Sequence, residues 1–189
     1  MATTLLLKNA LVIGTMDDQL RELADASVFI RGNKVEAVGP ASELPDTADK
    51  VIDMTGHVLI PGLINTHHHM FQTLTRALPA AQNAELFDWL TALYPVWQNI
   101  TPKMQQVATR TAMAELMLSG CTTAADHAYV YVNGTRLEDS VQAAQEMGMR
   151  FHAARGAMSL GQSKGGLPPD ALVEQDEQAI LKEMQRTVE

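Results

Sequence analysis

The sequence has 189 residues, 46% of them hydrophobic and 19% charged, which predicts a folded chain with a core and excludes a disordered one. The net charge is −8, so we expect no binding to the phosphate backbone of nucleic acids. A lone cysteine, Cys121, excludes an intrachain disulfide and a multi-cysteine zinc motif, and suits a cytoplasmic location. We find no secretory signal, and no apolar run approaches the about 20 residues of a membrane helix.

The N-terminal part of the chain, over residues 1–57, predicts a small β unit. Short apolar runs separated by turns are expected as strands at 5–7, 11–13, 26–30, 35–39 and 51–54. Gly32 and Asn33 stand between two of these runs, which is typical of a β-hairpin turn.

From residue 58 onward the pattern changes to strands that alternate with helices. Strands are expected at 58–64, 121–127 and 149–155, and helices at 84–97, 101–118, 137–148 and from 168–170 to the C-terminus. The first strand is nearly all apolar, as in a parallel sheet covered on both faces. Pro95 should end or kink the first helix, and Thr101 with Pro102 should begin the second. The alternation predicts an α/β fold with about three βα units and a parallel sheet.

Three consecutive histidines follow the first of these parallel strands. Side chains alternate faces along a strand, so His67 and His69 should point to one side and His68 to the other. Neutral imidazole nitrogens bind zinc and iron, and two of them at this spacing can reach one ion. We therefore predict that His67 and His69 bind one divalent metal. Zinc and iron both accept this ligand set, and we expect zinc in preference to iron. The alternative is that they are core histidines bonded to the backbone.

The segment PGLINTHHHMFQ, residues 61–72, resembles the first-strand signature of the amidohydrolase superfamily, P-G-[LF]-[IV]-[DN]-x-H-x-H. The resemblance implies a (β/α)8 TIM-like barrel flanked by a small β-sandwich. Residues 1–57 would then be the N-terminal part of the sandwich domain, and residues 58–189 the N-terminal part of a metal-dependent barrel. It also implies that His67 and His69 are metal ligands at the end of the first barrel strand.

Two positions indicate which branch of the family the sequence resembles. Binuclear members usually carry Asp at the position of Asn65, so N-x-H-x-H is more similar to the mononuclear aminohydrolases. Gln72 resembles a glutamine that hydrogen-bonds the purine in some of these enzymes, and a solvated loop residue is the alternative. Further segments, among them RGAMSLGQSKGGLPPD, are similar to deaminases of oxopurines such as 8-oxoguanine.

The resemblance implies hydrolytic deamination of a small oxopurine-like ring by metal-activated water. A hydroxytriazine ethylaminohydrolase, a binuclear ring-opening amidohydrolase and a non-catalytic fragment remain alternatives. Homo-oligomerisation also stays open.

Other polar residues lie at predicted strand ends. Arg155 is a candidate substrate contact, with a structural ion pair as the alternative. Asp126 and His127 are expected to cap or turn the chain, or to orient a ligand imidazole. His152 is expected to be a core histidine.

The sequence supplies fewer parts than such a site needs. A catalytic zinc usually has at least three protein ligands, and two are predicted here. A (β/α)8 barrel takes about 250 residues, more than follow residue 57. We therefore expect the N-terminal part of a longer enzyme, with its catalytic residues beyond Glu189. The segment alone should bind metal weakly and be inactive.

Overall fold

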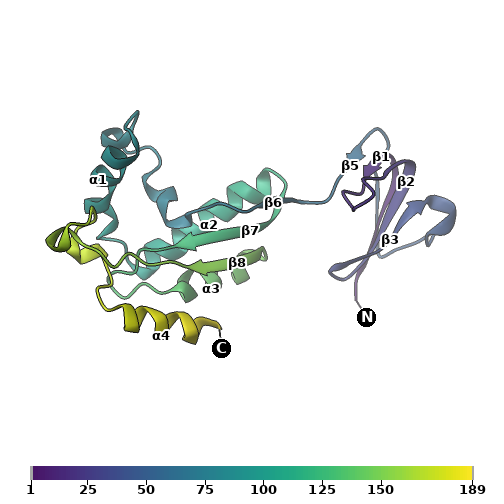
Figure 1. Ribbon diagram of the computed structural model, residues 1–189. Helices are drawn as coiled ribbons and strands as arrows, with labels where there is room; N and C mark the ends of the chain where they lie inside the picture. The colour runs from purple at the N-terminus through teal and green to yellow at the C-terminus, as the bar shows by residue number, and fades with distance from the viewer. Residues whose placement is uncertain (1, 189) are drawn as a thin grey trace. The chain divides into compact units, whose positions relative to one another are not determined.

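The computed structural model describes residues 2–188, and the chain divides into two compact units, Met1–Pro61 and Gly62–Glu189 (Figure 1). The strands are β1 (Thr4–Gly14), β2 (Glu22–Arg31), β3 (Lys34–Pro40), β4 (Lys50–Asp53), β5 (Val58–Leu59), β6 (Leu63–Asn65), β7 (Cys121–Ala128) and β8 (Arg150–Arg155). The α-helices are α1 (Leu86–Trp97), α2 (Pro102–Leu118), α3 (Leu137–Met147) and α4 (Glu177–Val188). The domain boundary expected between residues 57 and 58 stays a prediction.

The first unit contains one mixed sheet. Its order is β3-β2-β1-β4, and β5 also pairs with β1. The predicted hairpin is confirmed, because β2 and β3 are antiparallel neighbours and Gly32 takes a positive φ of 58° in the turn between them. The runs at 5–7 and 11–13 form one strand rather than two, since the chain continues through an irregularity that includes Asn9 at φ 63°.

The second unit contains the predicted parallel sheet, in the order β6-β7-β8. Helix α2 packs against α3 and β7, and α3 packs against β8. Buried side chains between these helices and the sheet form one core cluster: Met70, Ala112, Met113, Cys121, Ala124, Ala144 and Met149. Because the strands are parallel, their carboxyl ends share one edge, where such folds carry their sites.

The ends of α2 and α3 match the sequence signals. Thr101 Oγ1 accepts a hydrogen bond from the Met104 amide at 3.3 Å, as the predicted cap requires. Gly148 ends α3 in the left-handed conformation, with φ 72°. Pro95 does not end α1, which runs two residues further, so the helix lacks the one hydrogen bond that the Pro95 nitrogen cannot donate.

The apolar run over 58–64 is two strands, which corrects the prediction of one. β5 pairs with β1 and β6 pairs with β7, and Pro61 between them has no N–H to give to either ladder. The expected burial is also wrong. Leu63 is 52% and Ile64 68% exposed, since no side chain among residues 2–188 covers them.

The last helix begins later than predicted. Asp170 does not open α4; its carboxylate instead accepts hydrogen bonds from the Ser163 amide and hydroxyl. The cap is Asp176, whose Oδ1 accepts from two backbone amides of the first turn. Within the described residues no helix is long and apolar enough to cross a membrane.

Candidate functional site

The side chains of His67 and His69 lie together just beyond the carboxyl end of β6. Their ring centroids are 5.3 Å apart, with the planes at 86°. This spacing suits one ion that binds both imidazole nitrogens at about 2.0–2.1 Å. The arrangement therefore brings together the two ligands that the sequence predicts.

A hydrogen bond fixes which nitrogen of His69 is available. His69 Nδ1 lies 2.7 Å from the backbone carbonyl oxygen of His127, and that oxygen can only accept. Nδ1 must therefore carry the proton, which leaves the lone pair of Nε2 for a metal ion. Ligand histidines are commonly oriented by such a second hydrogen bond.

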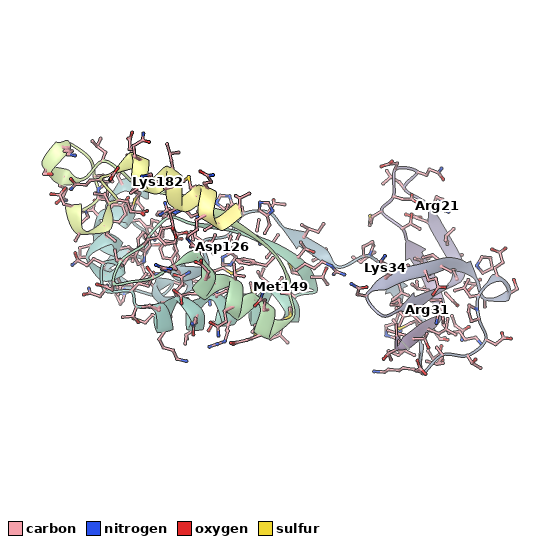
Figure 2. All side chains as sticks on the ribbon, turned by 90° about the horizontal axis from the view of Figure 1, so that it is seen from below. Arg21, Arg31, Lys34, Asp126, Met149 and Lys182 are labelled. Carbon is pink, nitrogen blue, oxygen red and sulfur yellow. The ribbon has the colours of Figure 1, made fainter. Side chains whose placement is uncertain are left out.

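The end of β7 supports the histidine segment at two further points. The His127 amide donates to the His68 carbonyl oxygen at 2.9 Å, and the Met70 amide donates to Asp126 Oδ1 at 2.8 Å. Asp126 is 1% exposed and lies within the second unit (Figure 2). Burial raises the pKa of this carboxyl to about 6. Asp126 and His127 thus hold the histidine segment through a carboxylate and a main-chain oxygen, and their role in orienting a metal ligand stays a prediction.

A cavity of about 560 Å³ lies at this edge of the sheet. Its lining consists of Thr66, His67, His68, His69, Ala125, Asp126, His127, His152 and Ala154. His152 is exposed and lines the cavity, so its prediction as a core histidine is wrong; the small sheet leaves that face of β8 uncovered. Burial, with His69 nearby, lowers the pKa of His127 and favours its neutral ring.

His68 also lines this cavity, although the sequence predicts that it faces away from His67 and His69. It is half-buried, and its Nδ1 is buried without a partner among residues 2–188. Burial is the main cause that lowers its pKa, and the neighbouring His69 adds to the effect. The lowered pKa favours the neutral ring of His68.

Gln72 lies on the 3-10 helix that follows the histidines, Met70–Thr75. It shares a second hollow of about 250 Å³ with His67, His68, His69, Thr73 and Arg76. Its Nε2 donates to the hydroxyl of Tyr129 at 2.8 Å. Gln72 is thus part of the same site as the predicted ligands.

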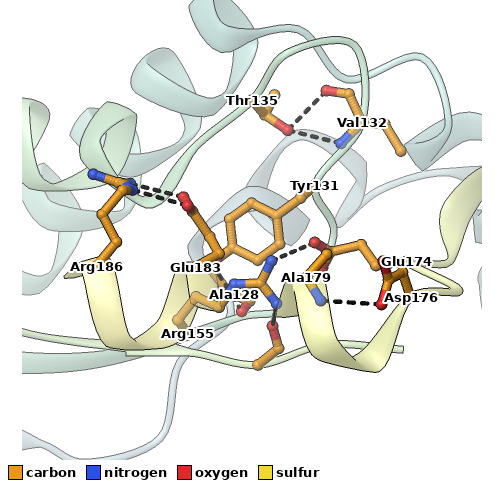
Figure 3. A network of polar contacts seen from close by, with 11 residues as sticks. Ala128, Tyr131, Val132, Thr135, Arg155, Glu174, Asp176, Ala179, Glu183 and Arg186 are labelled. Atoms are coloured by element: carbon orange, nitrogen blue, oxygen red, sulfur yellow. Dashed lines mark hydrogen bonds and ion pairs between the residues drawn. The ribbon is translucent and has the colours of Figure 1, made fainter. Parts of the chain in front are cut away.

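Arg155 lies in a buried network instead of in the cavity lining (Figure 3). Its side chain is 5% exposed and forms an ion pair with Glu174. The guanidinium also donates to the Gly156 carbonyl oxygen at 2.8 Å and lies 4.3 Å from the centre of the Tyr131 ring. This is the structural ion pair that the sequence left open, and a substrate contact for Arg155 stays a prediction.

The described residues hold an incomplete metal site. Between residues 2 and 188 no group of three or more His, Cys, Asp or Glu side chains could hold a metal ion. The two imidazoles fit a divalent ion as part of its ligand set, because His69 is held in the binding tautomer and His67 faces the same cavity.

Sequence reasoning missed two contributors to the site, the His127 carbonyl and Tyr129. A main-chain oxygen leaves no residue-type signal. Tyr129 could have been suspected, because it follows the predicted strand over 121–127 and so had to lie at the same sheet edge.

Parallel βα units with paired histidines at the carboxyl edge of the first strand are features of metal-binding barrel proteins. Residues 58–188 match the amidohydrolase family, and the chain belongs to that family. It is 44% identical to 8-oxoguanine deaminase of Pseudomonas aeruginosa over 96% of this chain and 40% of that protein. It is 35% identical to hydroxydechloroatrazine ethylaminohydrolase of Pseudomonas sp. strain ADP, over 88% and 37%.

Solved structures agree with this assignment. The chain superposes on atrazine chlorohydrolase from Arthrobacter aurescens TC1, solved in complex with zinc, with a TM-score of 0.88 at 31% identity. The match covers 97% of this chain and 42% of that one. The chain thus spans about 40% of the length of the deaminase that it matches.

Proposed function

We propose that the protein is a metal-dependent aminohydrolase that removes the exocyclic amine of an oxopurine-like ring, such as 8-oxoguanine. The paired imidazoles of His67 and His69 carry this proposal, because they converge on one cavity at the carboxyl edge of the sheet. The 44% identity to 8-oxoguanine deaminase supports the substrate class.

The residues of this chain would share the work as follows. His67 and His69 would hold one divalent ion, zinc in preference to iron, and the β7 end would keep His69 in its binding tautomer. A metal ion held there would supply the nucleophile for hydrolysis, a water molecule whose pKa is lowered to about 7. The groups that move protons to the leaving amine are expected beyond Glu189.

Gln72 would hold the ring in register for attack. Its amide offers a donor and an acceptor, which suits the mixed edge of an oxopurine. Gln72 lines one hollow together with His67 and His69, which supports a role for its amide beside a ring bound there. Such positioning lowers the barrier by removing rotational freedom before reaction.

The wider organisation belongs to the same proposal. We propose a β-sandwich domain that includes residues 1–57, a barrel domain that includes residues 58–189, and a cytoplasmic location. The substrate is a small molecule, with no nucleic acid or membrane partner, and the whole protein can be a homo-oligomer.

The test is an assay of the product of the complete coding sequence. Ammonia release from 8-oxoguanine is expected, and it should fall at least about 100-fold in His69→Ala, because a metal ligand is lost. Ethylamine release from a hydroxytriazine at a higher kcat/KM would instead favour the alternative suggested by the second relative. Activity that survives complete metal removal would overturn the proposal.

A further inference from the structure

Tyr129 connects the glutamine of the site to one of its metal-facing histidines. Gln72 Nε2 donates to the Tyr129 hydroxyl at 2.8 Å. The Tyr129 ring meets the ring of His69 edge-on, 5.2 Å between centroids, and meets Phe71 at the same distance. Phe71 is 1% exposed, so the tyrosine rests on a fixed core side chain.

The backbone of Gln72 is held as firmly as its side chain. Its amide donates to the His69 carbonyl oxygen at 3.0 Å, and its carbonyl oxygen accepts from the Thr75 hydroxyl at 3.1 Å. Thr75 is in turn bonded by the indole nitrogen of Trp97 at 3.1 Å. Hydrogen bonds therefore hold both the backbone and the side-chain amide of Gln72.

The Tyr129 hydroxyl can accept from the Gln72 amide nitrogen or donate to its oxygen, and in either sense the pair keeps one donor and one acceptor free. In the structure Nε2 faces Tyr129, the Oε1 atom is left as an acceptor, and no donor in residues 2–188 reaches it. The Tyr129 hydroxyl accepts from Gln72, and its own proton finds no acceptor in that part of the chain. A tyrosine phenol has an ordinary pKa of about 10, so it keeps this proton at neutral pH.

We propose that Tyr129 is a positioning and specificity residue, which makes Gln72 and Tyr129 together present one acceptor and one donor. That pair is complementary to a lactam edge, an N–H beside a C=O, on a heterocyclic substrate. The inference rests on the proposed function, in which Gln72 faces the ring. Tyr129 thus acts through Gln72 and selects substrate rings that carry a lactam.

Removing only the hydroxyl tests this. In Tyr129→Phe the ring contacts with His69 and Phe71 remain, but the Gln72 amide can turn over and offer a donor where the acceptor stood. We expect KM for 8-oxoguanine to rise about 3–10-fold, the size of one neutral hydrogen bond, with kcat changed less than about 2-fold. KM for 2-aminopurine, an amine-bearing purine without a lactam, should change less than about 2-fold.

The chain offers a matched control two residues away. The Tyr131 hydroxyl donates to the Ala128 carbonyl oxygen at 3.2 Å and has no bond to Gln72, so Tyr131→Phe should leave both constants unchanged. Equal losses for 8-oxoguanine and 2-aminopurine in Tyr129→Phe would overturn the specificity role.

A double-mutant cycle shows whether Tyr129 acts through Gln72. In a Gln72→Met background, Tyr129→Phe should have no further effect on KM, because the hydroxyl has lost its partner. Additive effects of the two substitutions would mean that Tyr129 acts independently, and would overturn the inference.

A third measurement needs no activity, so it separates this inference from the proposed function. The side-chain amide of Gln72, assigned in ¹⁵N–¹H spectra by its loss in Gln72→Glu, should shift in Tyr129→Phe and stay in place in Tyr131→Phe. If deamination is absent but this shift occurs, the function fails and the positioning role stands. An unshifted amide in Tyr129→Phe overturns the positioning role whatever the activity.

Discussion

At the scale of single residues, the carboxyl of Asp126 in the second unit is energetically costly to bury. Its carboxylate is 1% exposed, Oδ1 accepts from the Met70 amide, and Oδ2 is buried without a partner between residues 2 and 188. One hydrogen bond, from the Met70 amide, compensates the buried carboxyl within residues 2–188, which explains why burial raises its pKa to about 6. The residue therefore holds the histidine segment in place at a cost in charge burial.

This cost predicts a pH dependence of stability. The folded pKa of about 6 lies above the ordinary value of 3.8, so the neutral form favours folding below pH 3.8, and this contribution is lost as the pH rises through 6. Relative to Asp126→Asn, the wild type should lose up to about 3 kcal/mol of unfolding free energy between pH 4 and 7. Urea unfolding of both proteins across this range measures the difference.

A second substitution separates the charge from the hydrogen bond. Asp126→Asn keeps an acceptor for the Met70 amide, whereas Asp126→Ala leaves that buried amide unpaired and should cost about 1–3 kcal/mol more. A difference between wild type and Asp126→Asn that is the same at pH 4 and pH 7 would contradict the assignment of a raised pKa.

At the scale of elements, the approach of β6 to β7 depends on a residue without a side chain. A Cβ on Gly62 would lie 2.2 Å from Cγ2 and Oγ1 of Thr122, which is far inside contact distance. We expect Gly62→Ala to destabilise the second unit by about 1–3 kcal/mol through overpacking. Gly14→Ala is the control, because its nearest neighbours would lie at 3.5 Å or more. Urea unfolding compares the two, and equal effects would argue against the close approach.

Arg155 and Glu174 form an ion pair that joins the two ends of the segment after β8. Arg155 is almost fully buried, so removing its partner in Glu174→Ala should leave an unpaired charge and cost about 3–5 kcal/mol, measured by urea unfolding. Arg155→Met combined with Glu174→Leu removes both charges and should recover most of this loss.

The same variants test the substrate contact that the sequence suggested for Arg155. If the ion pair is its whole role, the double variant should keep the wild-type KM once the folded fraction is matched. A KM raised more than about 10-fold in that folded variant would instead support direct contact with substrate.

The elements that the sequence predicted best are those with their own local signals. The cap at Thr101 and the stop at Gly148 depend on neighbouring residues alone, so both could be located without the fold. The single strand over 58–64 was wrong because its pairing depends on distant partners, β1 for one half and β7 for the other. Apolar content does not report such partners.

For the candidate site too, the sequence predicts those features whose signal lies within one short segment. His67 and His69 could be paired because spacing along one segment decides which side chains share a face. The supporting contacts join residues 57 and 58 positions apart, as between Gln72 and Tyr129 or His69 and His127. Only the register of β7 beside β6 brings these residues together, and a sequence pattern does not contain that register.

At the scale of the whole molecule, the number of metal ions separates the mononuclear from the binuclear alternative. Asn65 stands where binuclear relatives usually carry Asp, and its Oδ1 already accepts from the His67 amide at 3.1 Å. Its neutral amide oxygen orients the backbone of His67, a proposed ligand, instead of supplying a charged ligand. We therefore expect one equivalent of divalent metal per chain in the product of the complete coding sequence, measured by elemental analysis.

Residues 1–189 alone should bind that metal far more weakly. Two imidazoles lie in one cavity, and no third ligand joins them in the part of the chain that the structure describes. Zinc affinity of the 189-residue chain, measured by competition with a chelator, should be lower than that of the complete product by at least about 100-fold. His67→Asn and His69→Asn should each abolish the remaining binding, and His57→Asn, in the first unit, should not. Two equivalents in the complete product would favour the binuclear alternative, and equal affinities for the two chains would mean that His67 and His69 already form a full site.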